Sequence, residues 1–303
     1  MRPRGEGITN KSPTPEILKG HGFGFRLERV ANRGSHALVW QAFRSDGLAV
    51  AIKVRDRESG FPIEWFEREG RLLQELTRLG VPGIVPLLEV LDCKAEPALV
   101  FPWRPLTLGH LKDRNWSQLR PILATVGKSL ERLHHLGWIH GDVSPGNILL
   151  DDSGQNPLLT DLGLAKRLHD SQGFGDEPNI SATPGFVDPS HPEPGPHTDW
   201  HSLGVCAWLA MTGSLPETGQ GSNLLIKSGI RAGLEPWLAQ DLAWWLLDYP
   251  SPRRLTRWLD GGKRRLTPKR QRFLRLAGTW KWLAVLVFGI LLAGLIAFRL
   301  LRR

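Results

Sequence analysis

The feature that most constrains this chain is a pair of short acidic motifs near its middle. Residues 140–150 read HGDVSPGNILL and residues 161–163 read DLG, so Asp142, Asn147 and Asp161 follow one another closely. Motifs of this type supply an aspartate that takes the proton of an attacking hydroxyl, and an asparagine and a second aspartate that hold magnesium. The short step from Asp142 to Asn147 lets one loop face a single phosphate from two sides. The pattern predicts a phosphoryl-transfer site.

Two weaker motifs precede this site. Residues 50–53 read VAIK, a strand pattern whose lysine contacts the α and β phosphates of a nucleotide. Glu69 follows in a helical pattern, on the same face as the leucines that come after it. From that face it can pair with Lys53; the other glutamates of this helix are the alternatives. Residues 32–39 overlap the glycine-rich pattern G-x-G-x-x-G-x-V only at Gly34 and Val39. Small residues in such a loop let backbone amides approach phosphates.

With these motifs in this order, residues 25–260 resemble the eukaryotic-type (Hanks-type) serine/threonine protein kinase family, as found in bacteria. The resemblance implies an α+β, bilobal protein-kinase-like fold over residues 21–260, with a small β-rich N-lobe (21–103) and a larger helical C-lobe (104–260). It implies ATP and Mg2+ as cofactors and a protein as substrate. The implied catalytic residues are Asp142, Lys53 and Asn147; the implied ATP-binding residues are Gly34, Val39, Ala51, Lys53, Glu69, Phe101, Trp103, Asn147 and Asp161; the implied metal ligands are Asn147 and Asp161.

Two residues of the catalytic motif depart from the family. Gly141 replaces an arginine that grips a phosphorylated activation loop, so activation by that route is not expected. Ser144 replaces a lysine near the γ phosphate, and H-G-D loops also resemble those of sugar kinases. Residues 181–189, SATPGFVDP, instead resemble the substrate-docking stretch of protein kinases, with Thr183 beside the catalytic aspartate. A protein kinase is therefore preferred; a sugar or lipid kinase and an ATP-binding pseudokinase are the alternatives.

Hydrophobic periodicity predicts the elements that carry these motifs. It indicates strands at residues 48–54 and 98–101 and helices at 63–79, 119–136, 199–212 and 236–247. The resemblance implies that Asp199 begins the central helix of the large lobe and accepts hydrogen bonds from backbone amides of the catalytic loop. An ordinary helix cap is the alternative for this residue.

The charge of the chain is concentrated at its C-terminal end. The formal net charge is +9, but residues 261–303 hold eleven Lys and Arg and no acidic residue, which leaves −2 for residues 1–260. Without a basic stripe in the body, nucleic acid is not expected as a partner. The two cysteines, Cys93 and Cys206, are far apart and imply neither a disulfide framework nor a zinc site. Residues 1–20 are predicted to be a flexible leader.

An apolar run near the C-terminus predicts a membrane anchor. Residues 282–298 read WLAVLVFGILLAGLIAF, about 26 Å as a helix against a hydrocarbon core of about 30 Å. We expect a transmembrane helix at residues 282–301, with a buried core helix as the alternative. Eight basic residues precede the run and three follow it, which predicts a single-pass protein of the inner cell membrane with its kinase-like domain in the cytoplasm. Residues 261–281 form a basic juxtamembrane linker, whose positions 263–281 are expected to contact anionic membrane lipids.

Overall fold

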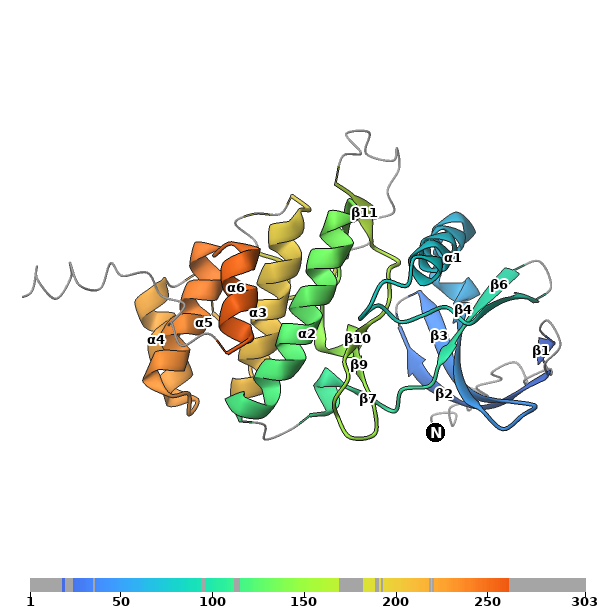
Figure 1. Ribbon diagram of the computed structural model, residues 1–303, viewed down its shortest axis with the longest axis horizontal. Helices are drawn as coiled ribbons and strands as arrows, with labels where there is room; N and C mark the ends of the chain where they lie inside the picture. The colour runs from blue at the N-terminus through green and yellow to red at the C-terminus, as the bar shows by residue number, and fades with distance from the viewer. Residues whose placement is uncertain are drawn as a thin grey trace, which may run out of the picture.

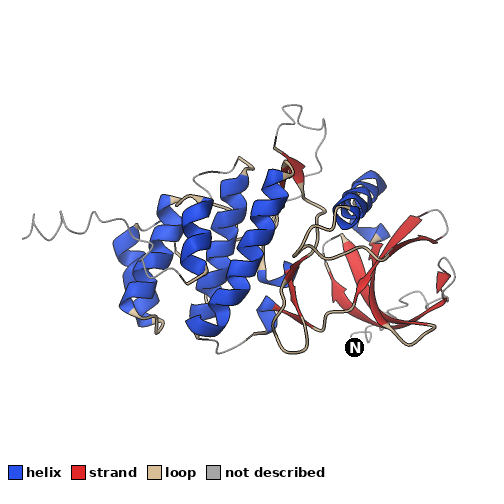
Figure 2. Ribbon diagram, viewed as in Figure 1, coloured by secondary structure: helices blue, strands red, loops and turns tan. Residues whose placement is uncertain are grey.

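The protein folds into two lobes joined by a short connector, residues 103–105 (Figure 1). The computed structural model describes residues 18–19, 24–34, 36–93, 96–111, 115–168, 182–188, 191, 193–217, 219 and 221–261. Figure 2 shows that strands dominate one lobe and helices the other. The predicted α+β bilobal fold, with a β-rich N-lobe and a helical C-lobe, is confirmed.

The N-lobe is an antiparallel sheet with strand order β1-β2-β3-β4-β6-β5. Its strands span Leu18–Lys19 (β1), Gly24–Arg33 (β2), Ala37–Arg44 (β3), Ala49–Arg55 (β4), Glu89–Cys93 (β5) and Glu96–Pro102 (β6). Side chains alternate between its two faces: on β6, Val100 belongs to a small cluster with Ile52 on one face, whereas Leu99 and Phe101 belong to the main core on the other. Lys53 pairs in register with Leu99. Its side chain therefore lies on the face that carries the main core.

Helix α1 (Ile63–Arg78) packs on this second face of the sheet. Its buried residues recur at helical spacing and include Glu69 among the apolar side chains. Gly70 permits the close approach, because an added Cβ atom would lie 3.1 Å from the Leu99 side chain. The helix thereby brings a buried carboxylate over the strand that carries Lys53.

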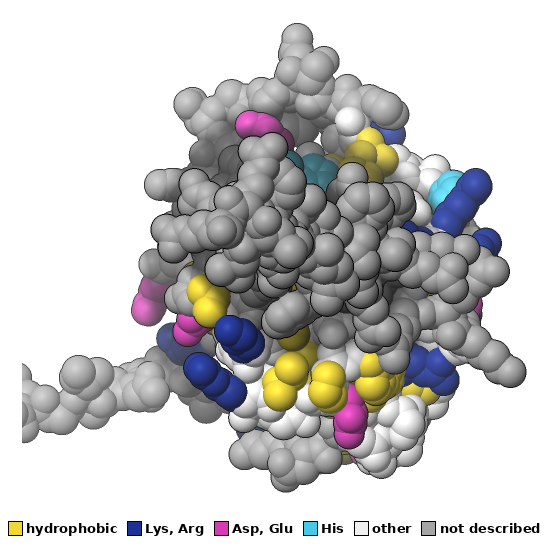
Figure 3. Space-filling view, turned by 90° about the vertical axis from the view of Figure 1, so that its left-hand side faces the viewer, with side chains coloured by type: hydrophobic (Ala, Val, Ile, Leu, Met, Phe, Trp, Pro, Cys, Tyr) yellow, Lys and Arg dark blue, Asp and Glu magenta, His cyan; other side chains and the backbone are white. Residues whose placement is uncertain are grey.

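The C-lobe is built around two long helices, α2 (Trp116–His135) and α3 (Pro196–Thr212). Helices α4 (Ser222–Arg231), α5 (Pro236–Asp248) and α6 (Pro252–Leu259) pack on the side away from the N-lobe (Figure 1). At the α4 end hydrophobic and basic side chains both reach the surface (Figure 3), and Leu224 and Ile230 are exposed there. Isolated exposed hydrophobic residues are common on proteins, and this end lies far from the connector.

Short strand pairs fix the loops that face the N-lobe. One group joins β7 (Leu106–Thr107), β9 (Ile148–Leu150) and β10 (Leu158–Leu159), and a second pairs β8 (Trp138–Ile139) with β11 (Lys166–Arg167). Strand β8 leads directly into the HGD motif and β11 follows the DLG motif. The two acidic motifs are thus anchored to the C-lobe next to each other.

The predicted strands and helices within residues 48–247 are confirmed, with shifts of up to three residues at their ends. The end of the predicted leader is ordered as β1, which pairs with β2. The predicted linker beyond Gly261 and the predicted transmembrane helix lie outside the described residues. Within the part of the chain that is described, none of the helices has the length and apolar character that a bilayer crossing requires.

Candidate active site

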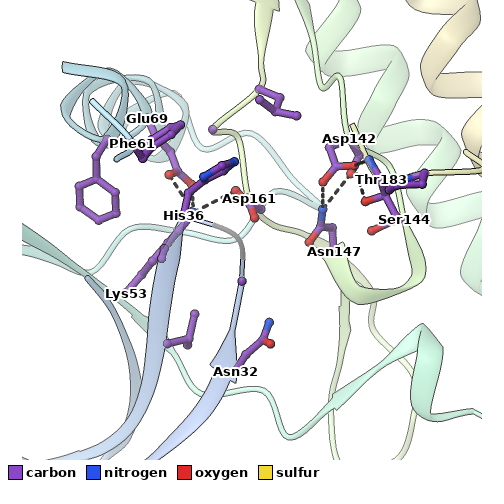
Figure 4. Close-up of a pocket in the computed structure, with 17 residues that line it drawn as sticks. Asn32, His36, Lys53, Phe61, Glu69, Asp142, Ser144, Asn147, Asp161 and Thr183 are labelled. Carbon is purple, nitrogen blue, oxygen red and sulfur yellow. Dashed lines mark hydrogen bonds and ion pairs between the residues drawn. The ribbon is translucent and has the colours of Figure 1, made fainter. Parts of the chain in front are cut away.

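A buried lysine and two carboxylates form the N-lobe side of the site (Figure 4). Lys53 Nζ donates hydrogen bonds to Glu69 Oε1 and Oε2, both at 2.8 Å, and to Asp161 Oδ1 at 2.9 Å. Lys53 is 9% exposed and Glu69 3% exposed. The sequence-predicted pairing of Lys53 with Glu69 is present, and Asp161 of the DLG motif joins it from the C-lobe.

The protonation of this cluster follows from burial and charge. Burial alone lowers the pKa of Lys53, but attraction to the carboxylates of Asp161 and Glu69 outweighs it and raises that pKa. Burial raises the pKa of Glu69 more than the charge of Lys53 lowers it. For Asp161 the balance is reversed: burial opposes ionisation, but the charge of Lys53 holds the pKa below its usual value. At neutral pH the cluster therefore presents a charged ammonium and an ionised Asp161.

Asp142 of the HGD motif is held by two residues that follow it in the chain. Its Oδ2 atom accepts a hydrogen bond from Asn147 Nδ2 at 2.8 Å, and that nitrogen also donates to the Asp142 backbone oxygen at 2.9 Å. Its Oδ1 atom accepts from the backbone nitrogen and the hydroxyl of Thr183, at 2.8 and 2.7 Å. Figure 4 shows these side chains together on the C-lobe side. The expected position of Thr183 beside the aspartate is confirmed.

The backbone of the HGD motif is hydrogen-bonded to Asp199. This residue lies in the first turn of α3 and is 1% exposed. Asp199 Oδ2 accepts a hydrogen bond from the His140 backbone nitrogen at 2.8 Å, and Oδ1 accepts from that of Gly141 at 2.9 Å. His134 Nε2 lies 2.8 Å from Oδ2. The prediction that Asp199 accepts backbone amides of this loop is confirmed. An ordinary helix cap would not reach so far along the chain.

Gly141 has a backbone conformation that other residues rarely adopt. Its φ is +82°, and an added Cβ atom would lie 2.6 Å from the backbone oxygen of Leu164. We expect Gly141→Ala to lower the free energy of unfolding by about 1 to 3 kcal/mol, measured by urea denaturation. Gly146→Ala is the control, because its Cβ would meet nothing closer than Ser144 Oγ at 4.0 Å. Equal stability of the two variants would contradict this account of Gly141.

Between the lobes lies a cavity of about 380 Å³, which we call the interlobe cavity. Its volume is within the usual range of small-molecule sites. Both lobes contribute, and the lining combines ionisable side chains with small and apolar ones. Sequence-predicted residues in the lining are Gly34, Val39, Lys53, Glu69, Asp142, Asn147, Asp161 and Thr183.

Three predicted ATP-binding residues do not line this cavity. Ala51 and Phe101 face each other across the β4–β6 pair, and the Trp103 backbone nitrogen donates to the Ala49 oxygen at 3.4 Å. They lie where β4 pairs with β6 and just after β6. The structure therefore gathers the other predicted ATP-binding residues in one cavity but leaves these three outside its lining.

Sequence reasoning missed several residues that enclose the cavity, among them His36 and Phe61. The ring of His36, from the turn between β2 and β3, stacks on Phe61 with centroids 4.6 Å apart and planes 18° apart. Both residues line the interlobe cavity (Figure 4). His36 lay within the glycine-rich pattern and could have been singled out as the one ring in that stretch, but no local signal marks Phe61. Ser144, noted only as a departure, also lines the cavity.

The side chains in the interlobe cavity suit a magnesium nucleotide. Asp161 and Asn147 offer hard oxygen ligands, and Lys53 offers a cation for phosphate oxygens. Within the described residues no group of three His, Cys, Asp or Glu side chains could hold a metal unaided.

A β-rich lobe and a helical lobe that meet at a lysine–glutamate pair, an HGD loop and a DLG loop define a protein-kinase-like protein. Residues 25–255 match the protein kinase domain family, and the chain belongs to that family.

Bacterial serine/threonine-protein kinases are among its relatives. The chain is 32% identical over 228 residues to PknK of Mycobacterium tuberculosis, covering 70% of this chain and 20% of PknK. It is 29% identical over 212 residues to PknA of the same species, covering 65% of this chain and 49% of PknA. It is 31% identical over 225 residues to PkaA of Streptomyces coelicolor, covering 66% of this chain and 40% of PkaA. The chain thus spans half or less of the length of these relatives.

Proposed function

We propose that this chain is an ATP-dependent serine/threonine protein kinase. The observation that carries the proposal is the arrangement around Asp142, whose carboxylate is fixed by Asn147 and Thr183 at a cavity shared with the Lys53–Glu69–Asp161 cluster. The protein kinase family and relatives that are named serine/threonine kinases support it.

Each residue has a role that its surroundings suit. Lys53, oriented by Glu69, would bind the α and β phosphates of ATP, and Asn147 and Asp161 would hold magnesium, which would neutralise charge on the phosphates. ATP would supply the γ-phosphoryl group. Asp142 orients the incoming hydroxyl and takes its proton. Asn147 and Thr183 keep the Asp142 carboxylate in one rotamer, so that it is already oriented when the hydroxyl arrives.

The assignment of a protein substrate rests on Thr183. It is tested by offering protein and sugar acceptors in parallel. We expect the full chain to transfer labelled phosphate from ATP to serine or threonine of a generic protein such as casein, and not to aminoglycoside sugars. Transfer to the sugars alone would favour a small-molecule kinase, the class whose catalytic loops resemble this one at Gly141 and Ser144. ATP binding without transfer to either acceptor would favour a pseudokinase.

We also propose that the enzyme is tethered to the inner membrane by residues 282–301, with the kinase domain in the cytoplasm and residues 263–281 against anionic lipids. The support is the uncharged run at 282–298 and the basic residues before it. The full chain should then stay with the membrane pellet after a carbonate wash. Release of the intact chain by carbonate would contradict the anchor.

A further inference from the structure

An arginine of α1 makes a contact that crosses from the N-lobe to the C-lobe. Arg68 Nη2 donates a hydrogen bond of 2.7 Å to the backbone oxygen of Ala165, which is 1% exposed. Ala165 immediately precedes β11, the short strand after the DLG motif. Arg68 is the residue next to Glu69 on the helix. A single side chain thus connects the helix that carries Glu69 with the start of the activation segment, as we name the chain from Asp161 to Asp188.

Two tryptophans hold the guanidinium in place. Arg68 Cζ lies 5.2 Å from the ring centroid of Trp65 and 6.0 Å from that of Trp138. Arg167 covers the Trp138 ring as well, at 4.8 Å. Planar guanidinium groups are attracted to aromatic faces within this range. The contact with Ala165 is therefore restrained by packing on the α1 side and on the C-lobe side.

The C-lobe partners of Arg68 are continuous with the catalytic loop. Trp138 lies in β8, which pairs with β11 and leads into His140 and Gly141. In a family kinase an arginine at the position of Gly141 would reach the activation segment from this loop. Here that side chain is missing, and Arg68 reaches the same segment from the opposite lobe.

We propose that Arg68 is a positioning residue that holds α1 against the start of the activation segment, so that Glu69 stays paired with Lys53 without phosphorylation of the segment. The inference rests on the proposed kinase function and deepens it by naming how the site is kept closed. Glu69 can reach Lys53 only while α1 stays packed on the sheet in the position seen here. The charge-assisted hydrogen bond to Ala165 and the contact with the Trp138 ring tie the lobes together, while Trp65, on α1 itself, holds the guanidinium in place.

A double-mutant cycle in the full chain tests this role. If Arg68 acts through Glu69, Arg68→Ala should lower both MgATP affinity and kcat/KM about tenfold in the wild-type background. In the Glu69→Gln background it should lower them less than about twofold. Arg68→Lys should retain most of the wild-type value, because it keeps a charged donor. Arg71→Ala is the matched control on the same helix, since its side chain is 66% exposed and lies 3.4 Å from Glu67, one turn away.

Equal losses from Arg68→Ala in the two backgrounds would mean a general structural role and would overturn the proposal; so would no loss in the wild-type background. Arg68→Met, which keeps the apolar stem of the side chain but has no hydrogen-bond donor and no charge, supplies the cycle if Arg68→Ala does not fold. Calorimetric MgATP binding distinguishes failure of the kinase proposal from failure of the Arg68 proposal. If the wild-type chain binds MgATP but transfers no phosphate, the proposed kinase function is wrong, while MgATP affinities of the four variants of the cycle still decide the role of Arg68. A wild-type chain that binds no MgATP overturns both.

The independence from phosphorylation has its own measurement. The full chain, co-expressed with a phosphatase and shown by mass spectrometry to be unmodified, should phosphorylate casein at its full initial rate without a lag. A lag that shortens as the chain becomes phosphorylated would overturn this part of the proposal.

Discussion

Replacing Asp142 with asparagine is expected to lower kcat for phosphate transfer by about 10²- to 10⁴-fold, the usual contribution of a positioned proton acceptor. The amide oxygen of the new residue still accepts the hydrogen bonds from Thr183; its NH2 group replaces one acceptor of the Asn147 side chain, which keeps its hydrogen bond to the backbone oxygen of residue 142. An amide cannot take the proton of the incoming hydroxyl. MgATP affinity should therefore change little, because its main ligands are other residues.

The comparison is made by initial rates and by calorimetric MgATP binding on the same preparations. Asp152→Asn is the matched control, because Asp152 is an exposed aspartate in the turn after β9. An Asp142→Asn variant with wild-type kcat would show that this carboxylate is not the proton acceptor. A parallel loss of MgATP affinity would instead indicate that the loop had collapsed.

The centre of the site follows from the sequence because each of its residues is placed by a local rule. Alternation along β4 puts Lys53 on the face toward α1, and the helical period of α1 puts Glu69 on the face toward the sheet. Asp142 and Asn147 share one short loop. For these residues the local pattern indicates which side chains can meet, and it favours Glu69 over the other glutamates of α1.

The contacts of Arg68 could not be predicted in the same way. Arg68 and Arg71 are both arginines of one helix and look alike in the sequence. What separates them is the position of Ala165 and Trp138, which depends on how β8 and β11 pair and how the lobes meet. The same holds for the His36–Phe61 stack, which depends on the path of the turn before α1.

Helix boundaries also depended on side-chain contacts that periodicity does not report. The predicted helix at 119–136 begins three residues earlier, at Trp116, because the Asn115 side chain accepts a hydrogen bond from the Gln118 backbone nitrogen at 3.1 Å. Asparagine is among the preferred residues at such a cap. The signal was in the sequence but outside the apolar pattern that defined the helix.

Replacing Lys53 with methionine is expected to cost both stability and nucleotide binding. Methionine keeps much of the volume but leaves Glu69 and Asp161 facing each other without the ammonium that joins them. Removing one partner of a buried ion pair costs about 3 to 5 kcal/mol. The free energy of unfolding in urea should fall by about that amount, whereas Lys227→Met, at an exposed position of α4, should leave it unchanged.

A second substitution separates the charge effect from a packing effect. Glu69→Gln in the Lys53→Met background removes one of the two uncompensated carboxylates and should restore part of the lost unfolding free energy. It should not restore MgATP binding, because the cation for the phosphates is still missing. If the double variant were no more stable than Lys53→Met alone, the stability lost with Lys53 would come from packing, and the cluster would not be held together by charge.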